Sequence, residues 1–125
     1  MSEKRIAIIG ASNKRERYAN KAVRAYRDAG FTVYPVHPQE KEVEGLRVYK
    51  SVLDISEQID EVSLYIPAAA GMQIIEQIAQ KGIKKVYFNP GTESDELVAK
   101  AKQRGINPLL TCSILALGKN PGDYV

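Results

Sequence analysis

The chain has 125 residues, 44% of them hydrophobic and 26% charged, and a net charge of +3, which are ordinary values for one globular domain. One cysteine excludes an internal disulfide, a single histidine argues against a structural zinc site, and no apolar run reaches the roughly 18 residues of a membrane span. We therefore expect a single cytoplasmic domain over residues 1–125, with no metal site, no membrane partner and no signal peptide.

The first predicted element is a buried strand. The apolar run in residues 4–9 stops at Gly10 and is followed by Ala11, Ser12 and Asn13, which is typical of a strand that feeds a βα turn. Such a turn presents backbone N–H groups at a helix N-terminus, where the helix dipole favours a phosphate or diphosphate.

The helix after this turn is amphipathic. Ala19, Ala22, Val23 and Tyr26 are spaced i, i+3, i+4 and i+7, and Gly30 ends the pattern. The first turn and this helix contain six basic residues, namely Lys14, Arg15, Lys21, Arg17, Arg24 and Arg27. No nucleic-acid motif accompanies them, so we expect a small polyanion rather than nucleic acid as partner. The helical residues are interpreted as a solvated face, and only the two in the loop, Lys14 and Arg15, as candidate phosphate ligands.

A second strand is predicted over residues 31–36, because this segment is rich in aromatic and β-branched residues. His37 and Pro38 follow it. A charged loop rich in Glu and Lys then leads through Gly45, and Ser51 is predicted to cap a short helical turn.

The remaining elements continue the alternation. A third strand over residues 61–66 stops at a proline, and a helix follows over residues 69–81. A fourth strand is predicted over residues 85–88, and a capping box in residues 92–95 begins the last clear helix. Residues 108–111 form a fifth strand, and the tail after it is left unassigned.

This alternation of short strands and helices predicts an α/β fold, a single Rossmann-like domain with a doubly wound, five-stranded, mainly parallel sheet. In such sheets ligands bind outside the carboxyl ends of the strands, where the strand order reverses. The residues that follow each strand are therefore the candidate ligand contacts.

Two common nucleotide sites are excluded by the first turn and the second strand. A dinucleotide fingerprint needs glycines where Ser12 and Arg15 stand after Gly10, and an acidic residue at the end of the second strand, where this chain has His37. A Gly-Lys-Ser/Thr phosphate loop does not occur either.

Four segments together resemble a known family: residues 10–13, 34–38, 49–55 and 65–67. Their sequences and order look like those of the small standalone CoA-binding proteins, which resemble the CoA-binding domain of the succinyl-CoA synthetase alpha subunit. The similarity extends from Arg5 to about Leu117.

The resemblance implies a Rossmann-like domain that binds coenzyme A or an acyl-CoA without catalysing a reaction. The implied contacts are Gly10, Ala11, Ser12, Asn13, Lys14 and Arg15 for the diphosphate and pantetheine, His37, Pro38 and Lys41 for the adenosine phosphates, and Ile66, Pro67, Asn89, Pro90 and Gly91 for the adenine and pantetheine. In the synthetase the phosphohistidine lies in a second domain, so the chain is expected to act as a carrier, a sensor or a detached subunit of an acyl-CoA ligase.

Several alternatives stay open at this stage. His37 either binds a phosphate or ribose or simply lies in a rigid loop, and Cys112 either faces the crevice or, as we favour, packs in the core. The chain could also be a small enzyme that uses a nucleotide cofactor through a degenerate loop, or a regulatory domain that has lost its ligand. No acyl group or protein partner is indicated.

Overall fold

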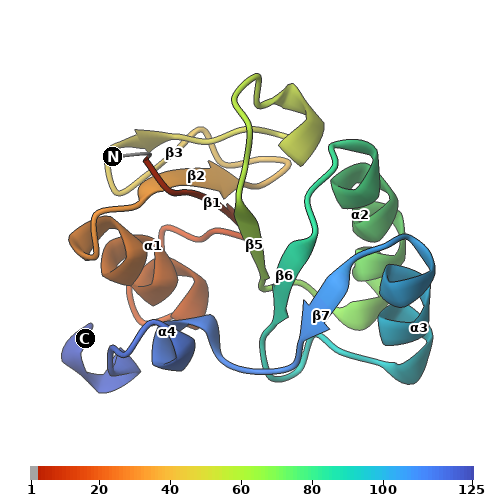
Figure 1. Ribbon diagram of the computed structural model, residues 1–125. Helices are drawn as coiled ribbons and strands as arrows, with labels where there is room; N and C mark the ends of the chain where they lie inside the picture. Colours follow the sequence, from red (N-terminus) through yellow and green to blue (C-terminus); the bar gives the residue numbers. More distant parts are fainter. Residues whose placement is uncertain (1–2) are drawn as a thin grey trace.

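A five-stranded parallel sheet forms the centre of the structure, a computed structural model that describes residues 3–125 (Figure 1). Its strands, in the spatial order β2-β1-β5-β6-β7, are β2 (Thr32–Val36), β1 (Arg5–Ile9), β5 (Glu61–Leu64), β6 (Lys85–Phe88) and β7 (Asn107–Leu109). Every neighbouring pair is parallel. The predicted Rossmann-like α/β class is confirmed, and the five predicted strands are present with ends that differ by up to two residues.

Helices cover both faces of the sheet (Figure 1). Helices α1 (Tyr18–Asp28) and α4 (Ser113–Ala116) lie on one face, and α2 (Ala68–Gln80) and α3 (Asp95–Gln103) lie on the other. A 3-10 turn, η1 (Val52–Asp54), is capped by Ser51 as predicted, and a second one, η2 (Pro121–Asp123), is close to the C-terminus. Within residues 3–125, none of the helices has the length and apolar character needed to cross a bilayer.

The alternation of side chains along β1 divides the core in two. Ile6 and Ile8 pack with α1 and α4, while Ala7 and Ile9 pack with α2 and α3. Both faces of a central parallel strand are buried, which is why residues 6–9 form an uninterrupted apolar run. Gly71 lets α2 approach α3 closely, since a Cβ there would lie 2.8 Å from a methyl carbon of Leu97.

The strand order reverses between β1 and β5. From β1 the chain passes through α1 to β2 at one edge, and it then returns past β1 to β5 on the other side. The loops that leave β1 and β5 therefore diverge and open a crevice above the carboxyl ends of these strands.

The charged segment after β2 is not a plain loop as expected. It contains a small antiparallel hairpin of β3 (Glu42–Val43) and β4 (Leu46–Arg47), joined by a turn in which Glu44 and Gly45 both have positive φ. Strands of two residues show no periodicity, so the sequence pattern could not reveal them.

The start of α3 also differs from the prediction. Ser94, rather than a capping box begun by Thr92, is the N-cap, and its hydroxyl accepts a hydrogen bond from the Leu97 N–H at 3.1 Å. The Thr92 hydroxyl instead donates to the Asn89 carbonyl at 2.7 Å and holds the turn that precedes the helix.

One basic residue of α1 is buried rather than solvated as expected. Arg24 is 7% exposed, and its guanidinium donates to the Arg15 carbonyl at 2.8 Å and to the Tyr124 carbonyl at 3.1 Å. It also donates to the Asn20 side chain at 2.8 Å. Arg24 therefore joins the loop after β1 to the C-terminal segment.

Candidate functional site

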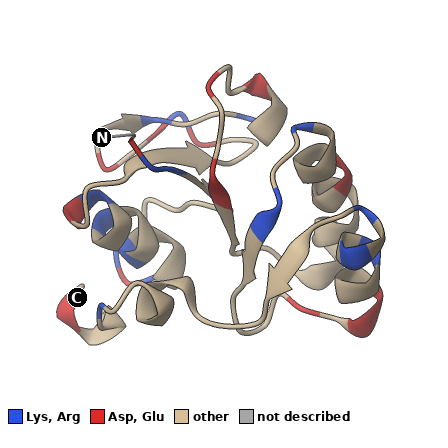
Figure 2. Cartoon of the chain, viewed as in Figure 1, with Lys and Arg blue, Asp and Glu red and all other residues tan. Residues whose placement is uncertain are grey.

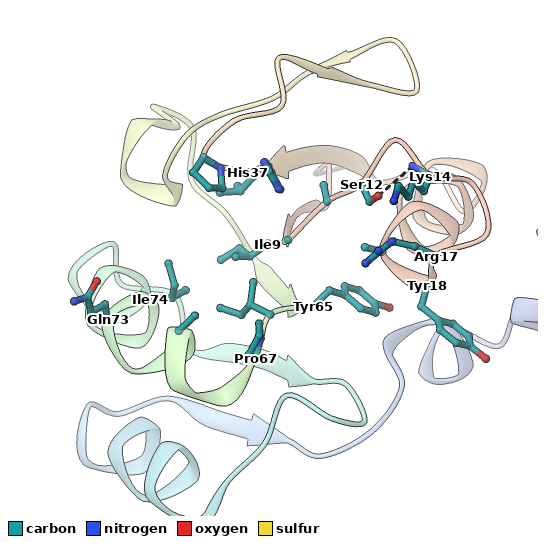
Figure 3. Close-up of a pocket in the computed structure, with 17 residues that line it drawn as sticks. Ile9, Ser12, Lys14, Arg17, Tyr18, His37, Tyr65, Pro67, Gln73 and Ile74 are labelled. Atoms are coloured by element: carbon teal, nitrogen blue, oxygen red, sulfur yellow. Dashed lines mark hydrogen bonds between the residues drawn. The ribbon is translucent and has the colours of Figure 1, made fainter.

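A cleft of about 860 Å³ opens at the carboxyl ends of β1, β2 and β5 (Figure 3). The loop after β1, the start of α1, the end of β2 and the start of α2 surround it. The lining residues are Ile9, Gly10, Ala11, Ser12, Lys14, Arg17, Tyr18, Ala19, Val36, His37, Pro38, Tyr65, Ile66, Pro67, Ala70, Gln73 and Ile74. The cleft therefore lies at the reversal of strand order, where the sequence predicts the ligand site.

The turn at the base of the cleft depends on Gly10. Its φ is +89°, and a Cβ at this position would lie 2.9 Å from the carbonyl carbon of Tyr65. The Gly10 and Ala11 N–H groups donate to the Val36 carbonyl at 2.9 and 3.2 Å. These bonds hold the loop between the ends of β2 and β5 and turn the following backbone toward the cleft.

The cleft is suited to an anion. Neither α1, whose N-cap is Arg17, nor α2, whose N-cap is Pro67, has a side-chain cap or an acidic residue in its first turn. Both helices begin at the cleft, so their unpaired N–H groups and positive dipole ends are available to a ligand. Lys14 and Arg17 add two cations, and the lining residues include no Asp or Glu.

The two ends of the cleft differ in chemistry. In Figure 3, Ser12, Lys14 and Arg17 lie at one end, and His37, Gln73 and Ile74 lie at the other. The Lys14 backbone N–H donates to the Ser12 hydroxyl at 3.1 Å, which shapes the loop at the cationic end.

The loop after β2 positions the imidazole of His37. Its Nδ1 accepts hydrogen bonds from the backbone N–H groups of Gln39 and Glu40, each at 3.0 Å. The hydrogen-bond network thus assigns the proton to Nε2, which can donate to a ligand oxygen. His37 therefore braces its loop and also lines the cleft, and its contact with a phosphate or ribose stays a prediction.

Eight of the predicted site residues line this cleft, and six do not. Those that line it are Gly10, Ala11, Ser12, Lys14, His37, Pro38, Ile66 and Pro67, whereas Asn13, Arg15, Lys41, Asn89, Pro90 and Gly91 lie outside it. Lys41 is exposed on the loop before β3. Direct contact of any of these residues with a ligand stays a prediction.

Two of the outlying residues are held by the segment that contains the hairpin. The Arg15 guanidinium donates to the Glu44 carboxylate at 3.2 Å, and the Asn13 side chain donates to the Glu42 carbonyl at 2.8 Å. Asn13 also bonds to the Glu40 carboxylate. These contacts fasten the outer side of the loop after β1, and the two side chains do not face the cleft.

The Asn89 side chain belongs to a buried hydrogen-bond network behind the cleft. It is 2% exposed; its amide nitrogen donates to the Ser63 hydroxyl and the Leu64 carbonyl, both at 2.8 Å, and its amide oxygen accepts from the Ser113 N–H at 2.8 Å. The Tyr65 hydroxyl shares a hydrogen bond of 3.2 Å with the Ser113 hydroxyl. Burial raises the pKa of Tyr65 to about 12.

A second, smaller cavity of about 320 Å³ adjoins the cleft, and Tyr18 and Tyr65 line both. Its other walls are Asn89, Pro90, Cys112, Leu115 and Pro121. Cys112 is partly buried, and it both packs against the core and lines this cavity.

Sequence reasoning missed part of the cleft. Gln73 and Ile74 come from α2, and only the tertiary structure shows that the first turns of this helix face the loop after β1. Arg17 and Tyr18 could have been found, because they lie in the basic segment that the sequence singles out and directly begin the helix.

The comparisons with known proteins agree on one family. A family model described as "CoA binding domain" matches residues 4–118. The 4-hydroxybutyrate–CoA ligase (ADP-forming) of Nitrosopumilus maritimus is 33% identical over 124 residues, which are 96% of this chain and 18% of the ligase. The acetate–CoA ligase (ADP-forming) of Methanocaldococcus jannaschii is 32% identical over 81 residues, 65% of this chain and 12% of the ligase.

A solved structure gives the same fold. It is described as a hypothetical protein from Pyrococcus horikoshii OT3, with a TM-score of 0.86 and 36% identity, and the match covers 92% of this chain and 81% of that one. This chain thus spans less than a fifth of the length of the two ligases, but most of the length of that structure.

Proposed function

Since the chain belongs to the CoA binding domain family, and is related to a small part of ADP-forming acyl-CoA ligases, we propose that it binds coenzyme A or an acyl-CoA without catalysing a reaction itself. The observation that carries this proposal is the cleft at the β1/β5 reversal, with two uncapped helix N-termini, two cations and no carboxylate. CoA is a polyanion with three phosphates and a long neutral arm, which matches this combination.

The diphosphate of CoA belongs at the cationic end of the cleft. There the loop after β1 passes Ser12 and ends at the first turn of α1, whose N–H groups are not used by a capping side chain. Lys14 and Arg17 line this end, and within residues 3–125 neither forms a salt bridge. Both cations are thus free to pair with phosphate oxygens.

The adenosine belongs at the other end. His37 presents a donor from its Nε2, Gln73 offers an amide, and Ile66 and Ile74 supply apolar surface for a purine. The pantetheine arm then leaves the diphosphate past Tyr18 and Tyr65, toward the second cavity, which these two residues also line.

The contacts around the cleft support a binding role rather than catalysis. His37 is the sole histidine, and its Nδ1 accepts two backbone hydrogen bonds instead of pairing with a carboxylate. An activated nucleophile needs a neighbouring base, and no hydroxyl or thiol among the cleft residues is bonded to one. The alternative of a dinucleotide-dependent enzyme gains no support, because the lining includes no carboxylate for a ribose.

Isothermal titration calorimetry of the whole chain with CoA and with NAD tests the ligand. We expect CoA to bind and NAD to bind at least tenfold more weakly. Lys14→Ala should weaken CoA binding roughly tenfold, since one partly screened charge pair contributes about 1 kcal/mol or slightly more. Lys84→Ala, which removes an exposed lysine far from the cleft, is the matched control and should leave binding unchanged.

A steric variant tests the position of the ligand. Ser12→Trp places a bulky side chain in the turn that must approach the phosphates, and we expect CoA binding to fall at least a hundredfold with little change in melting temperature. Unchanged CoA affinity in a folded Ser12→Trp protein would place the ligand elsewhere. Tighter binding of NAD than of CoA would overturn the assignment itself.

A further inference from the structure

We infer that the second cavity is an acyl subsite, so that the protein binds short-chain acyl-CoA thioesters more tightly than free CoA. This inference rests on the proposed function and adds the class of ligand. The cavity of about 320 Å³ is walled by Pro90, Cys112, Leu115 and Pro121, together with Tyr18 and Tyr65.

The cavity is connected with the cleft where the arm of CoA would emerge. Tyr18 and Tyr65 line both spaces, and Tyr18 lies beyond Arg17, at the opposite end of the cleft from His37 (Figure 3). A ligand whose adenosine lies near His37 and whose diphosphate lies near Lys14 therefore directs its thiol end toward this cavity.

The walls of the cavity favour an apolar occupant. No charged residue lines it, and the polar groups at its base are already paired. The Asn89 amide nitrogen donates hydrogen bonds to Ser63 and Leu64, and its amide oxygen accepts one from Ser113. The Tyr65 hydroxyl is hydrogen-bonded to the Ser113 hydroxyl.

The pantetheine arm carries two amides, which lose free energy when they are buried without hydrogen-bond partners. An acyl chain needs no such partners and gains free energy by leaving water. The polar groups of the cavity already have hydrogen-bond partners and its other walls are apolar. The cavity therefore suits the acyl group better than the pantetheine arm that carries it.

Two exposed leucines provide a matched test. Leu115 lines the cavity and is 59% exposed, while Leu110 is equally exposed, at 59%, and lies outside it. Replacement of either by aspartate should be tolerated by the fold, because both side chains are mostly in solvent. Only Leu115→Asp places a charge at the acyl subsite.

The experiment is calorimetric titration of the whole chain with CoA, acetyl-CoA, butyryl-CoA and hexanoyl-CoA. We expect the affinity to rise by up to about fourfold for each methylene that is buried, until the cavity is full. Leu115→Asp should lower the affinity for butyryl-CoA at least tenfold and change that for CoA by less than twofold. Leu110→Asp should change neither.

Alkylation of Cys112 by N-ethylmaleimide gives an independent measurement, since this sole thiol lines the same cavity. Saturating butyryl-CoA should slow the alkylation at least fivefold more than saturating desulfo-CoA does, an analogue chosen because the free thiol of CoA would itself react with the maleimide. Equal affinities for CoA and butyryl-CoA would overturn the acyl subsite while leaving the proposed function intact. An equal loss of both ligands in Leu115→Asp would do the same, because the cavity would then hold a part common to both. Failure of both CoA and acyl-CoA to bind would overturn the proposed function as well.

Discussion

Helices α1 and α2 begin at the carboxyl edge of the sheet without side-chain caps, whereas α3, which follows β6 at the same edge, is capped by Ser94. The first turn of α3 also carries Asp95 and Glu96, and Figure 2 shows acidic residues where this helix begins. The chain thus satisfies the N-terminus of α3 with its own side chains and leaves the other two available. A parallel sheet positions several helix N-termini alike, and the local sequence decides which of them can receive an anion.

The loops in front of these helices differ in the same way. The loop after β1 bends toward the cleft at Gly10 and exposes Lys14, whereas the loop after β6 turns its Asn89 side chain inward, where three hydrogen bonds satisfy it. Polar groups of the first region are left available to a ligand, whereas Asn89 in the second region is fully paired within the protein. Four predictions follow from this contrast, in order of decreasing effect.

The largest effect is expected from the glycines of the two loops. Gly10 and Gly91 both have positive φ, but a Cβ would meet the Tyr65 carbonyl group only at Gly10, and nothing lies within 4 Å at Gly91. Gly91→Ala should lower the free energy of unfolding by about 1 to 2 kcal/mol, the cost of the left-handed backbone. Gly10→Ala should lower it by at least about 3 kcal/mol, because the β1 turn must also move. Urea denaturation measures both, and similar losses would contradict the close approach to Tyr65.

The second prediction concerns Tyr65, which lies between the two regions. Burial raises its pKa to about 12, from an ordinary value of about 10. The folded state retains the proton more strongly, so between pH 10 and 12 the unfolded state binds fewer protons and the free energy of unfolding falls as the pH rises. By pH 11 the loss from this residue should be about 1.4 kcal/mol.

The control for that measurement is Tyr65→Phe, which cannot ionise at this position. Urea unfolding at pH 8 and pH 11 should show a larger loss of stability in the unchanged protein than in the variant, with the other tyrosines contributing equally to both. Equal losses would mean that the Tyr65 hydroxyl is not held neutral by its surroundings.

The third prediction concerns a variant in which α1 gains a side-chain cap and so no longer differs from α3. Arg17 is the N-cap of α1, so Arg17→Asp supplies a capping carboxylate and should raise the free energy of unfolding by about 0.5 to 1 kcal/mol. The same change should weaken CoA binding at least tenfold, since it occupies N–H groups and reverses a charge at the cleft. Arg17→Ala separates the two effects, as it removes the charge without adding a cap. Thermal melting and calorimetry together test this, and undiminished CoA affinity in Arg17→Asp would show that the ligand does not use this helix end.

The smallest effect on CoA binding is expected when α3 loses its cap, so that all three helices begin without one. Ser94→Ala deletes the cap of α3 and should lower the free energy of unfolding by about 1 kcal/mol. CoA affinity should not change, because Ser94 lies outside the cleft. A loss of affinity in this variant would show that α3 also faces the ligand.

Much of the fold could be predicted from local patterns in the sequence. The apolar run before Gly10 predicts β1, the spacing of Ala19, Ala22 and Val23 predicts α1, and the position of Ser51 predicts the cap of η1. These features arise from interactions between residues close in sequence, and an alternation of such elements is compatible with few topologies. The order of motifs was enough to indicate the family, which the comparisons confirm.

The roles of individual polar side chains could not be predicted from local sequence patterns. Arg24 and Arg15 belong to the same basic segment as Lys14, yet Arg24 is buried against the carbonyl of Tyr124, and Arg15 is paired with Glu44. Each of these partners lies at least 29 residues away in sequence. A charge pattern shows that basic residues are present, but only their three-dimensional neighbours decide which of them remain free.

The sequence by itself therefore determined the α/β class, the edge of the sheet at which the cleft opens and the family, because apolar periodicity and turn residues act locally. Tertiary structure alone decided that α2 contributes Gln73 and Ile74 to the cleft, that the Asn89 amide faces inward, and that a second cavity opens beside Tyr18. The physical reason is that a cleft is bounded by segments brought together by sheet pairing and helix packing, and whether a polar group is free depends on hydrogen bonds formed across those long-range contacts.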